Sequence, residues 1–226
     1  MPARLHQASN VSLWSAWRPA DVLTVAVAVE GESDVAAVES MLGTRSIRVD
    51  AQRIFRTSGK AKLDRKIRGY NQAAAQSPWL VLRDADHDEG GCAAALRESR
   101  LPANSQNPGL SFRLAVRSIE AWLLADAEAF AATFLVPASI VPSGVEQLPD
   151  PKQTLGDLCR RSRKPAIRKA MAPPPGSAGR VGPEYVSFLS QYSRTAWRPN
   201  VAAANAPSLA RALREIDRLL ANGIWR

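Results

Sequence analysis

Short apolar runs recur along the first half of the chain and are separated by segments with helical periodicity. Residues 22–29 are apolar and rich in β-branched side chains, interrupted only by Thr24, and residues 79–82 form a second such run. Runs of this kind predict strands that are buried on both faces, as in a parallel sheet. Residues 46–54 alternate apolar and basic side chains, which predicts a more exposed strand, and residues 111–116 are a fourth strand candidate.

The segments between these strands have the spacing of amphipathic helices. Apolar positions predict helices over residues 33–42, 60–76, 92–98 and 119–130. Strands that alternate with helices through short connections are typical of a doubly wound sheet. We therefore expect an α/β domain over residues 22–150, with a mostly parallel sheet of about four strands flanked by helices.

The distribution of charge divides the chain near a proline-containing turn at residues 148–151. Residues 1–150 carry 16 Lys and Arg against 17 Asp and Glu, whereas residues 151–226 carry 14 against 4. The last third therefore accounts for the whole formal net charge of +9. Helical periodicity there predicts a basic helical C-terminal region over residues 151–226, and the residues before the first strand form an N-terminal extension, 1–21.

Composition narrows the class of protein. The chain is 46% hydrophobic and 23% charged, as in globular proteins. An excess of basic residues favours a polyanionic partner, although a GC-rich genome produces the same excess. Its two cysteines lie far apart, which excludes a disulfide framework or a zinc cluster and fits a reducing cytoplasm. The longest apolar run is too short to span a bilayer, and the first residues do not resemble a signal peptide, so we expect no membrane association.

Carboxylates follow the predicted strands at the points where these end. Glu30 follows the first strand, with Asp34 four residues later in the first turn of the next helix. Asp84 and Asp86 follow the strand at 79–82, and Glu120 follows the fourth strand. Ligands of open α/β sheets bind beyond the carboxyl ends of the strands, so these side chains are expected to converge.

Each acidic group also has a structural interpretation. Acidic residues in the first turn of a helix stabilise the helix dipole, which explains Asp34 and Glu120, and the aspartates at 84 and 86 also suit a solvated turn. Three such groups at three strand ends nevertheless favour a Mg²⁺ or Mn²⁺ site, because hard cations prefer carboxylate oxygens. Metal ions held in this way promote phosphoryl-transfer chemistry.

The pattern Glu30-Gly31-x-x-Asp34, followed by Asp84-x-Asp86 after a later strand, resembles the Toprim superfamily. This superfamily includes topoisomerases, primases, ribonucleases that mature ribosomal RNA, and nucleases of the overcoming-lysogenization-defect type. The resemblance implies a compact four-stranded α/β core and metal-dependent chemistry on phosphodiesters. It also implies general acid–base work or metal contact for Glu30, and metal binding for Asp34, Asp84 and Asp86.

A narrower resemblance covers roughly residues 22–160. Its motifs are Gly59-Lys60-x-Lys62-Leu63, Asp84-x-Asp86, Ser118-Ile-Glu120-Ala-Trp-Leu-Leu-Ala-Asp126 and Asp150-Pro-Lys152. They are similar to those of a bacterial Toprim-like family of unassigned function, often encoded beside an AAA or ABC-type ATPase in suspected phage-defence loci. Gly59-Lys60 lacks the remaining residues of a P-loop. A separate partner ATPase is therefore expected.

Two groups of basic residues are candidates for contact with nucleic acid, because phosphate contacts come mainly from Arg and Lys. Alternative interpretations are a solvated helix face or a docking surface for an acidic partner. The candidates lie at the start of the second helix and in the densest basic run: Lys60, Lys62, Arg160, Arg161, Arg163 and Lys164.

These observations favour a metal-dependent nuclease that cleaves DNA or RNA, acting as the effector of an ATPase-partnered defence system. We expect Glu30, Asp84 and Asp86 to be catalytic, and the metal ligands to be drawn from these three with Asp34 and Glu120. The alternative is a non-catalytic Toprim-like module that binds nucleic acid or the ATPase.

Overall fold

The computed structural model describes residues 22–173 and 179–226, so the N-terminal extension that we expect over residues 1–21 lies outside the described residues. The described part contains a sheet of four parallel strands in the order β2-β1-β3-β4. The strands are β1 (Thr24–Val29), β2 (Arg48–Arg56), β3 (Trp79–Asp84) and β4 (Leu110–Ala115). The predicted α/β class and parallel sheet are confirmed.

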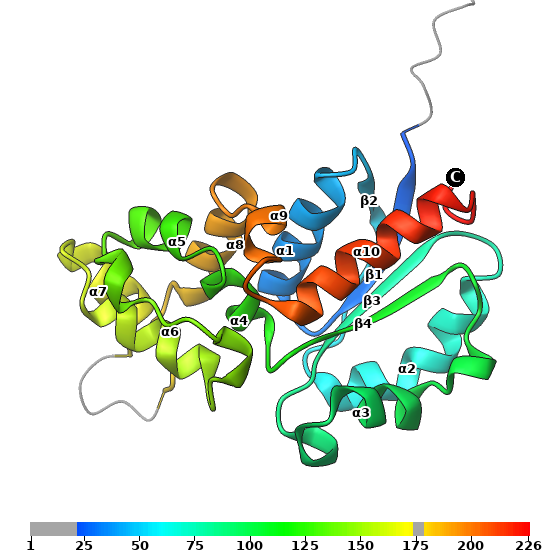
Figure 1. The fold of residues 1–226 in the computed structure, drawn as a ribbon, viewed down its shortest axis with the longest axis horizontal. Coiled ribbons are helices and arrows are strands. Elements are labelled where there is room, and N and C mark those ends of the chain that lie inside the picture. The colour runs from blue at the N-terminus through cyan, green and yellow to red at the C-terminus, as the bar shows by residue number, and fades with distance from the viewer. Residues whose placement is uncertain (1–21, 174–178) are drawn as a thin grey trace, which may run out of the picture.

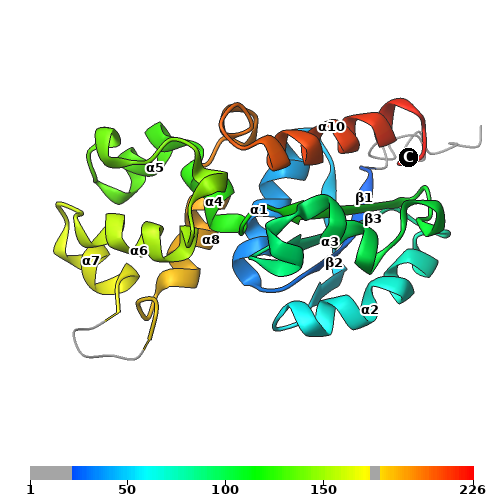
Figure 2. The ribbon, with the colours of Figure 1, turned by 60° about the horizontal axis from the view of Figure 1, so that its bottom comes forward.

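Helices cover both faces of this sheet and continue beyond it. Helices α2 and α3 cover one face, whereas α1 and α10 cover the other (Figure 1, Figure 2). The helices are α1 (Glu32–Gly43), α2 (Lys60–Ala73), α3 (Ala93–Arg100), α4 (Ile119–Leu124), α5 (Ala127–Phe134), α6 (Pro151–Arg160), α7 (Pro165–Met171), α8 (Tyr185–Thr195), α9 (Pro199–Ala202) and α10 (Pro207–Ala221).

The sequence of β1 explains this three-layer arrangement. Val25, Val27 and Val29 pack into the hydrophobic cluster beneath α1 and α10, while Ala26 and Ala28 face the cluster under α2 and α3. Successive side chains of a strand point to opposite faces, so an uninterrupted apolar run suits a strand with helices on both sides.

The C-terminal region is helical, as expected, and it packs back onto the sheet. Helices α4–α8 form a lobe beside the sheet, and α10 then returns across the face that α1 also covers (Figure 1). Trp225, which is 2% exposed, donates a hydrogen bond from its indole N–H to the carbonyl of Gly109 over 2.9 Å. The chain becomes strongly basic after residue 150, but one hydrophobic cluster includes residues from both sides of this position. The domain boundary there stays a prediction.

The structure corrects the prediction of a single helix over residues 119–130. Helix α4 ends at Leu124 and α5 begins at Ala127, because the Asp126 carboxylate caps α5 by accepting the N–H of Ala129 over 3.2 Å. The helical C-terminal region includes two short helices, α7 and α9.

In the part of the chain that the structure describes, no helix combines the length and apolar character needed to cross a bilayer.

Candidate functional site

A cavity of about 630 Å³ lies at the carboxyl ends of β1, β3 and β4, facing the start of α6. Both acidic and basic side chains line this cavity. The ionisable groups that line it are Glu30, Asp84, Asp86, Asp88, Glu120 and Asp150, together with His87, Lys60, Arg117, Lys152 and Arg180. Carboxylates that follow three different strands are therefore brought to one place, as the sequence predicts.

Glu30 and Asp84 are joined directly across the two central strands. The backbone N–H of Asp84 donates a hydrogen bond to Oε1 of Glu30 over 3.1 Å. The Asp84 carboxylate in turn accepts the N–H of Ile119, the first residue of α4, over 3.0 Å. Because β1 pairs in parallel with β3, and β3 with β4, the residues at the carboxyl ends of these strands lie together at one end of the sheet.

Asp34 approaches the same place from the first turn of α1. Its side chain accepts the backbone N–H of Gly31 over 2.8 Å and is nearly buried, since the residue is 6% exposed. The helix-capping interpretation of Asp34 is therefore compatible with its position in the acidic cluster.

Glu120 lies in the first turn of α4 and is 4% exposed. Its two carboxylate oxygens accept hydrogen bonds from the Ser118 hydroxyl over 2.6 Å and from the Tyr185 hydroxyl of α8 over 3.2 Å. Helix α8 of the helical lobe thus holds the Glu120 side chain near the carboxyl ends of the strands.

Burial and mutual repulsion shift the acid–base equilibria of this cluster. The pKa of Asp34 is raised to about 7, mainly by burial and in smaller part by the neighbouring carboxylates of Glu120 and Glu30. Burial, followed by repulsion from Asp34 and Glu120, raises the pKa of Asp84 well above its ordinary value. Burial also raises the pKa of Glu30. Glu30, Asp34 and Asp84 therefore lie close enough to one another and to the Glu120 carboxylate for their negative charges to repel.

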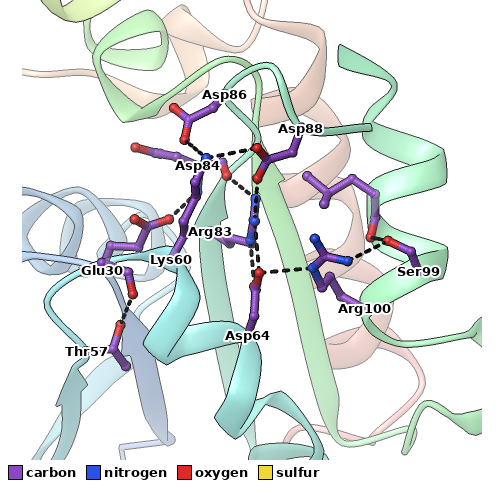
Figure 3. Close-up of polar contacts among 12 residues, drawn as sticks. Glu30, Thr57, Lys60, Asp64, Arg83, Asp84, Asp86, Asp88, Ser99 and Arg100 are labelled. Atoms are coloured by element: carbon purple, nitrogen blue, oxygen red, sulfur yellow. Dashed lines mark hydrogen bonds and ion pairs between the residues drawn. The ribbon is translucent and has the colours of Figure 1, made fainter. Parts of the chain in front are cut away.

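Asp86 lies beside this cluster but makes different contacts (Figure 3). Lys60, the first residue of α2, bridges Asp86 Oδ2 at 2.7 Å and Asp88 Oδ1 at 2.9 Å. Asp86 adopts a left-handed backbone conformation with φ of 49°, which aspartate tolerates better than most residues. Asp86 therefore lies in a turn and does not continue the strand that ends at Asp84, and the hydrogen bonds of the two side chains go to different partners.

A buried arginine supports the loop that carries these aspartates (Figure 3). Arg83, which is 1% exposed, forms hydrogen bonds to both carboxylate oxygens of Asp64 at 2.7 and 3.0 Å. Its other contacts are with Asp88 Oδ2 and the carbonyl of Asp84, both at 2.6 Å. The Asp64 carboxylate also accepts a hydrogen bond from Arg100 of α3 over 3.0 Å. This network ties β3, α2 and α3 to the cavity.

The acidic side chains meet the requirements of a metal site only in part. Over residues 22–173 and 179–226, no group of three or more His, Cys, Asp or Glu side chains has the arrangement of a ready-made metal site. The carboxylate oxygens are nevertheless the donors that Mg²⁺ and Mn²⁺ prefer, and the raised pKa values of Asp34, Asp84 and Glu30 indicate uncompensated negative charge. The carboxylate oxygens are therefore suitable ligands for a divalent cation, although the side chains do not form a complete coordination sphere.

The predicted nucleic-acid-binding residues do not gather in one patch. Lys60 lines the cavity, and Lys62 is exposed on α2. Helices α2 and α7 lie at opposite ends of the molecule in both views (Figure 1, Figure 2). The remaining candidates are exposed at the end of α6 and in the connection to α7: Arg160, Arg161, Arg163 and Lys164.

Several residues at the site were missed as candidates by sequence reasoning. Lys152 lies at the start of α6, within the Asp150-Pro-Lys152 motif, which does not by itself predict a role for the lysine. Arg180 reaches the cavity from a proline- and glycine-rich segment with no motif to mark it. Asp64 and Arg83 are ordinary members of an amphipathic helix and a strand, so only the tertiary structure identifies their pairing.

The comparisons with known proteins give no match: no protein-family model, no curated protein sequence and no solved structure matches this chain.

Proposed function

We propose that this protein is a Mg²⁺- or Mn²⁺-dependent nuclease that hydrolyses phosphodiester bonds of DNA or RNA. The observation that carries the proposal is the contact between Glu30 and Asp84 across adjacent parallel strands, in a cavity shared with Glu120. Burial in that cavity is costly for carboxylates that lack a cation, as the raised pKa values of both residues indicate.

Glu30, Asp34, Asp84 and Glu120 are the residues that would hold the cation, directly or through water. A divalent metal bound there supplies charge stabilisation at the phosphoryl group and lowers the pKa of water. Tyr185 and Ser118 orient Glu120, while Ile119 orients Asp84. Glu30 has a raised pKa and an oxygen on the cavity wall, which suits the acid–base role implied by the Toprim resemblance.

The basic groups around the cavity support an anionic substrate. Lys60, Arg117, Lys152 and Arg180 surround the carboxylates, where they can contact phosphate oxygens. Helices α2 and α6 both begin at this cavity; α2 carries exposed basic residues along its length, and α6 carries Lys152 at its start and Arg160 at its end. A polyanionic chain that crosses the cavity would contact both helices.

The biological setting follows from the resemblance to the ATPase-associated Toprim-like family. In this proposal a separate AAA or ABC-type ATPase supplies the nucleotide hydrolysis, and the nuclease is the effector of a phage-defence system in the cytoplasm. An ATPase encoded beside this protein would support this part of the proposal.

A second candidate is a non-catalytic module that binds nucleic acid or the ATPase. It is favoured by one observation, namely that the acidic side chains in the described ranges do not form a three-ligand metal group. Such a module would bind nucleic acid without cleaving it and would take up no Mn²⁺ at the acidic cluster.

The test is incubation of the purified chain with supercoiled plasmid and with RNA, in Mg²⁺, in Mn²⁺ and in EDTA. The nuclease proposal predicts metal-dependent cleavage that falls by about 10²-fold or more in Glu30→Gln, because a positioned acid–base group contributes at least that much. Glu128→Gln is the matched control, since this side chain on α5 is 82% exposed and does not line the cavity. Absence of cleavage in both metals, or equal cleavage by Glu30→Gln, would contradict the proposal.

A further inference from the structure

A second cavity, of about 400 Å³, opens on the outer edge of the sheet, away from the acidic cluster. It lies between β4, α3 and α10, and β4 is an edge strand because its one neighbour in the described sheet is β3. Three arginines from three different elements line it: Arg97 of α3, Arg113 of β4 and Arg211 of α10. None of these residues lines the cavity at the carboxyl ends of the strands.

The positive charge of this cavity is poorly compensated. Within the described residues, the Nε atoms of Arg97 and Arg113 are buried and have no hydrogen-bond partner. The pKa of Arg113 is lowered to about 10, mainly by burial; repulsion from Arg97, Arg218 and Arg211 contributes to this shift, and Glu215 opposes it. Glu215 is itself engaged by Arg218 through two hydrogen bonds of 2.8 and 2.9 Å. A buried cation normally has a counter-charge, so this arrangement suits an anionic ligand.

The other polar groups near the cavity are already occupied. One Nη of Arg97 donates to the side-chain oxygen of Gln106. The Ser208 hydroxyl accepts hydrogen bonds from the Trp122 indole and the Val116 N–H, at 2.7 and 3.2 Å, and donates to Glu146. The arginines are therefore the groups that remain for recognition of a charged ligand.

The rest of the wall is apolar. Phe112, Leu114 and Val116 of the β4 segment line the cavity together with Ala93 and Ala94 of α3. A few charged groups on an otherwise apolar wall of this volume are typical of sites for small organic ligands. A planar, weakly polar body can lie against this wall while an anionic group contacts the arginines.

We propose that the cavity between β4, α3 and α10 binds a small phosphorylated ligand of nucleotide class, with its phosphate on Arg97, Arg113 and Arg211. Guanidinium groups recognise phosphate oxygens through paired hydrogen bonds, and convergence of three such groups favours a phosphate monoester. The cavity is lined by residues of α3, β4 and α10 and has a volume of about 400 Å³, which suits a mononucleotide rather than a duplex. The site does not depend on the nuclease activity proposed above.

The test is calorimetric titration of the full chain with AMP, with inorganic phosphate and with adenosine, in EDTA so that the acidic cluster holds no metal. We expect AMP to bind with a stoichiometry of one, phosphate to bind more weakly, and adenosine to give no heat. Arg211→Gln should weaken AMP binding by about tenfold, which corresponds to one charged hydrogen bond. Arg211 is exposed, so this variant should fold normally.

Arg214→Gln is the matched control, because Arg214 is exposed on the same helix and does not line the cavity. It should leave the affinity for AMP unchanged, and Glu30→Gln should do the same, which separates this site from the proposed nuclease centre. Three results would overturn the proposal: no binding of AMP at millimolar concentration, equal weakening in the two arginine variants, or a single-stranded oligonucleotide that binds here more tightly than AMP.

Discussion

The backbone N–H of Asp84 lies 3.1 Å from Oε1 of Glu30, so the last residue of β3 is bound to the residue that follows β1. This contact places two carboxylates from distant parts of the sequence in one coupled cluster with Asp34 and Glu120. Such a cluster opposes folding at neutral pH unless a cation is bound, and this electrostatic cost leads to the first prediction.

Asp34→Asn should stabilise the metal-free protein at pH 8, by an amount on the order of 2 kcal/mol in the free energy of unfolding. The pKa of Asp34 is raised from 3.8 to about 7, so the native state binds the proton more tightly than the unfolded state does. Stability of the wild type is therefore lost as the pH rises between these values. The gain in the variant should vanish near pH 4. Urea unfolding at several pH values in EDTA measures it.

Asp126→Asn should change the free energy of unfolding in the opposite direction to Asp34→Asn. Arg198 lowers the pKa of Asp126 through hydrogen bonds to both carboxylate oxygens, although burial opposes this effect. The pair stabilises the native state above the unfolded pKa of about 3.8, and this contribution is lost as the pH falls through the lower native value. The variant should thus be less stable than the wild type at neutral pH. Urea unfolding at the same pH values measures this loss. For Asp34→Asn, a free energy of unfolding that depends on pH in the same way as that of the wild type would contradict the coupled cluster.

Arg83→Met should destabilise the protein by about 3 kcal/mol, because it removes one partner of a buried ion pair. Asp64 and Asp88 would lose their contacts with a guanidinium that is 1% exposed. Denaturant unfolding at neutral pH measures the loss. Adding Asp64→Asn to this variant should recover part of the stability, whereas a double variant with additive losses would show that the pair is not coupled.

Trp225→Ala should lower the free energy of unfolding by about 3 kcal/mol, because a large buried side chain and its hydrogen bond to Gly109 are both lost. Denaturant unfolding measures this loss. The core crosses residue 150, so wild type and variant should each unfold in one cooperative transition. Val201→Ala is a control at a side chain that is 46% exposed, and it should change little. Two separate thermal transitions in the wild type would instead support a domain boundary at residue 150.

Removing the basic residues of either helix should weaken binding of single-stranded DNA and RNA. Two triple glutamine variants test this, one at Lys62, Arg65 and Lys66 on α2, and one at Arg161, Arg163 and Lys164 beside α6. Each should flatten the dependence of log K on log salt, because fewer counterions are released. Fluorescence anisotropy between 50 and 200 mM salt measures these slopes. An unchanged slope in one variant would exclude that helix from the interface.

The sequence predicts the sheet well because local pattern determines it. Residues 25–29 are all apolar and buried, and alternation of their side chains supplies both hydrophobic clusters of the structure. The positions of Glu30, Asp84 and Glu120 at strand ends likewise follow from a parallel sheet.

Tertiary contacts determine what the sequence could not predict. The capping hydrogen bond to Asp126 divides one amphipathic segment into α4 and α5. The left-handed conformation of Asp86 turns it toward Lys60, away from the direction that an extended segment predicts. Tyr185 reaches Glu120 from a helix that lies 65 positions later in the chain, and no local pattern encodes that contact.

Binding of Mn²⁺ to the metal-free full chain, measured by calorimetry at pH 8, tests the central claim most directly. The wild type should bind Mn²⁺, and Asp84→Asn should weaken that binding by at least about tenfold because a charged ligand is lost from a buried cluster. Asp217→Asn, at a side chain that is 52% exposed on α10, should bind as the wild type does. A wild type that takes up no Mn²⁺, or an Asp84→Asn variant that binds it equally well, would contradict the account.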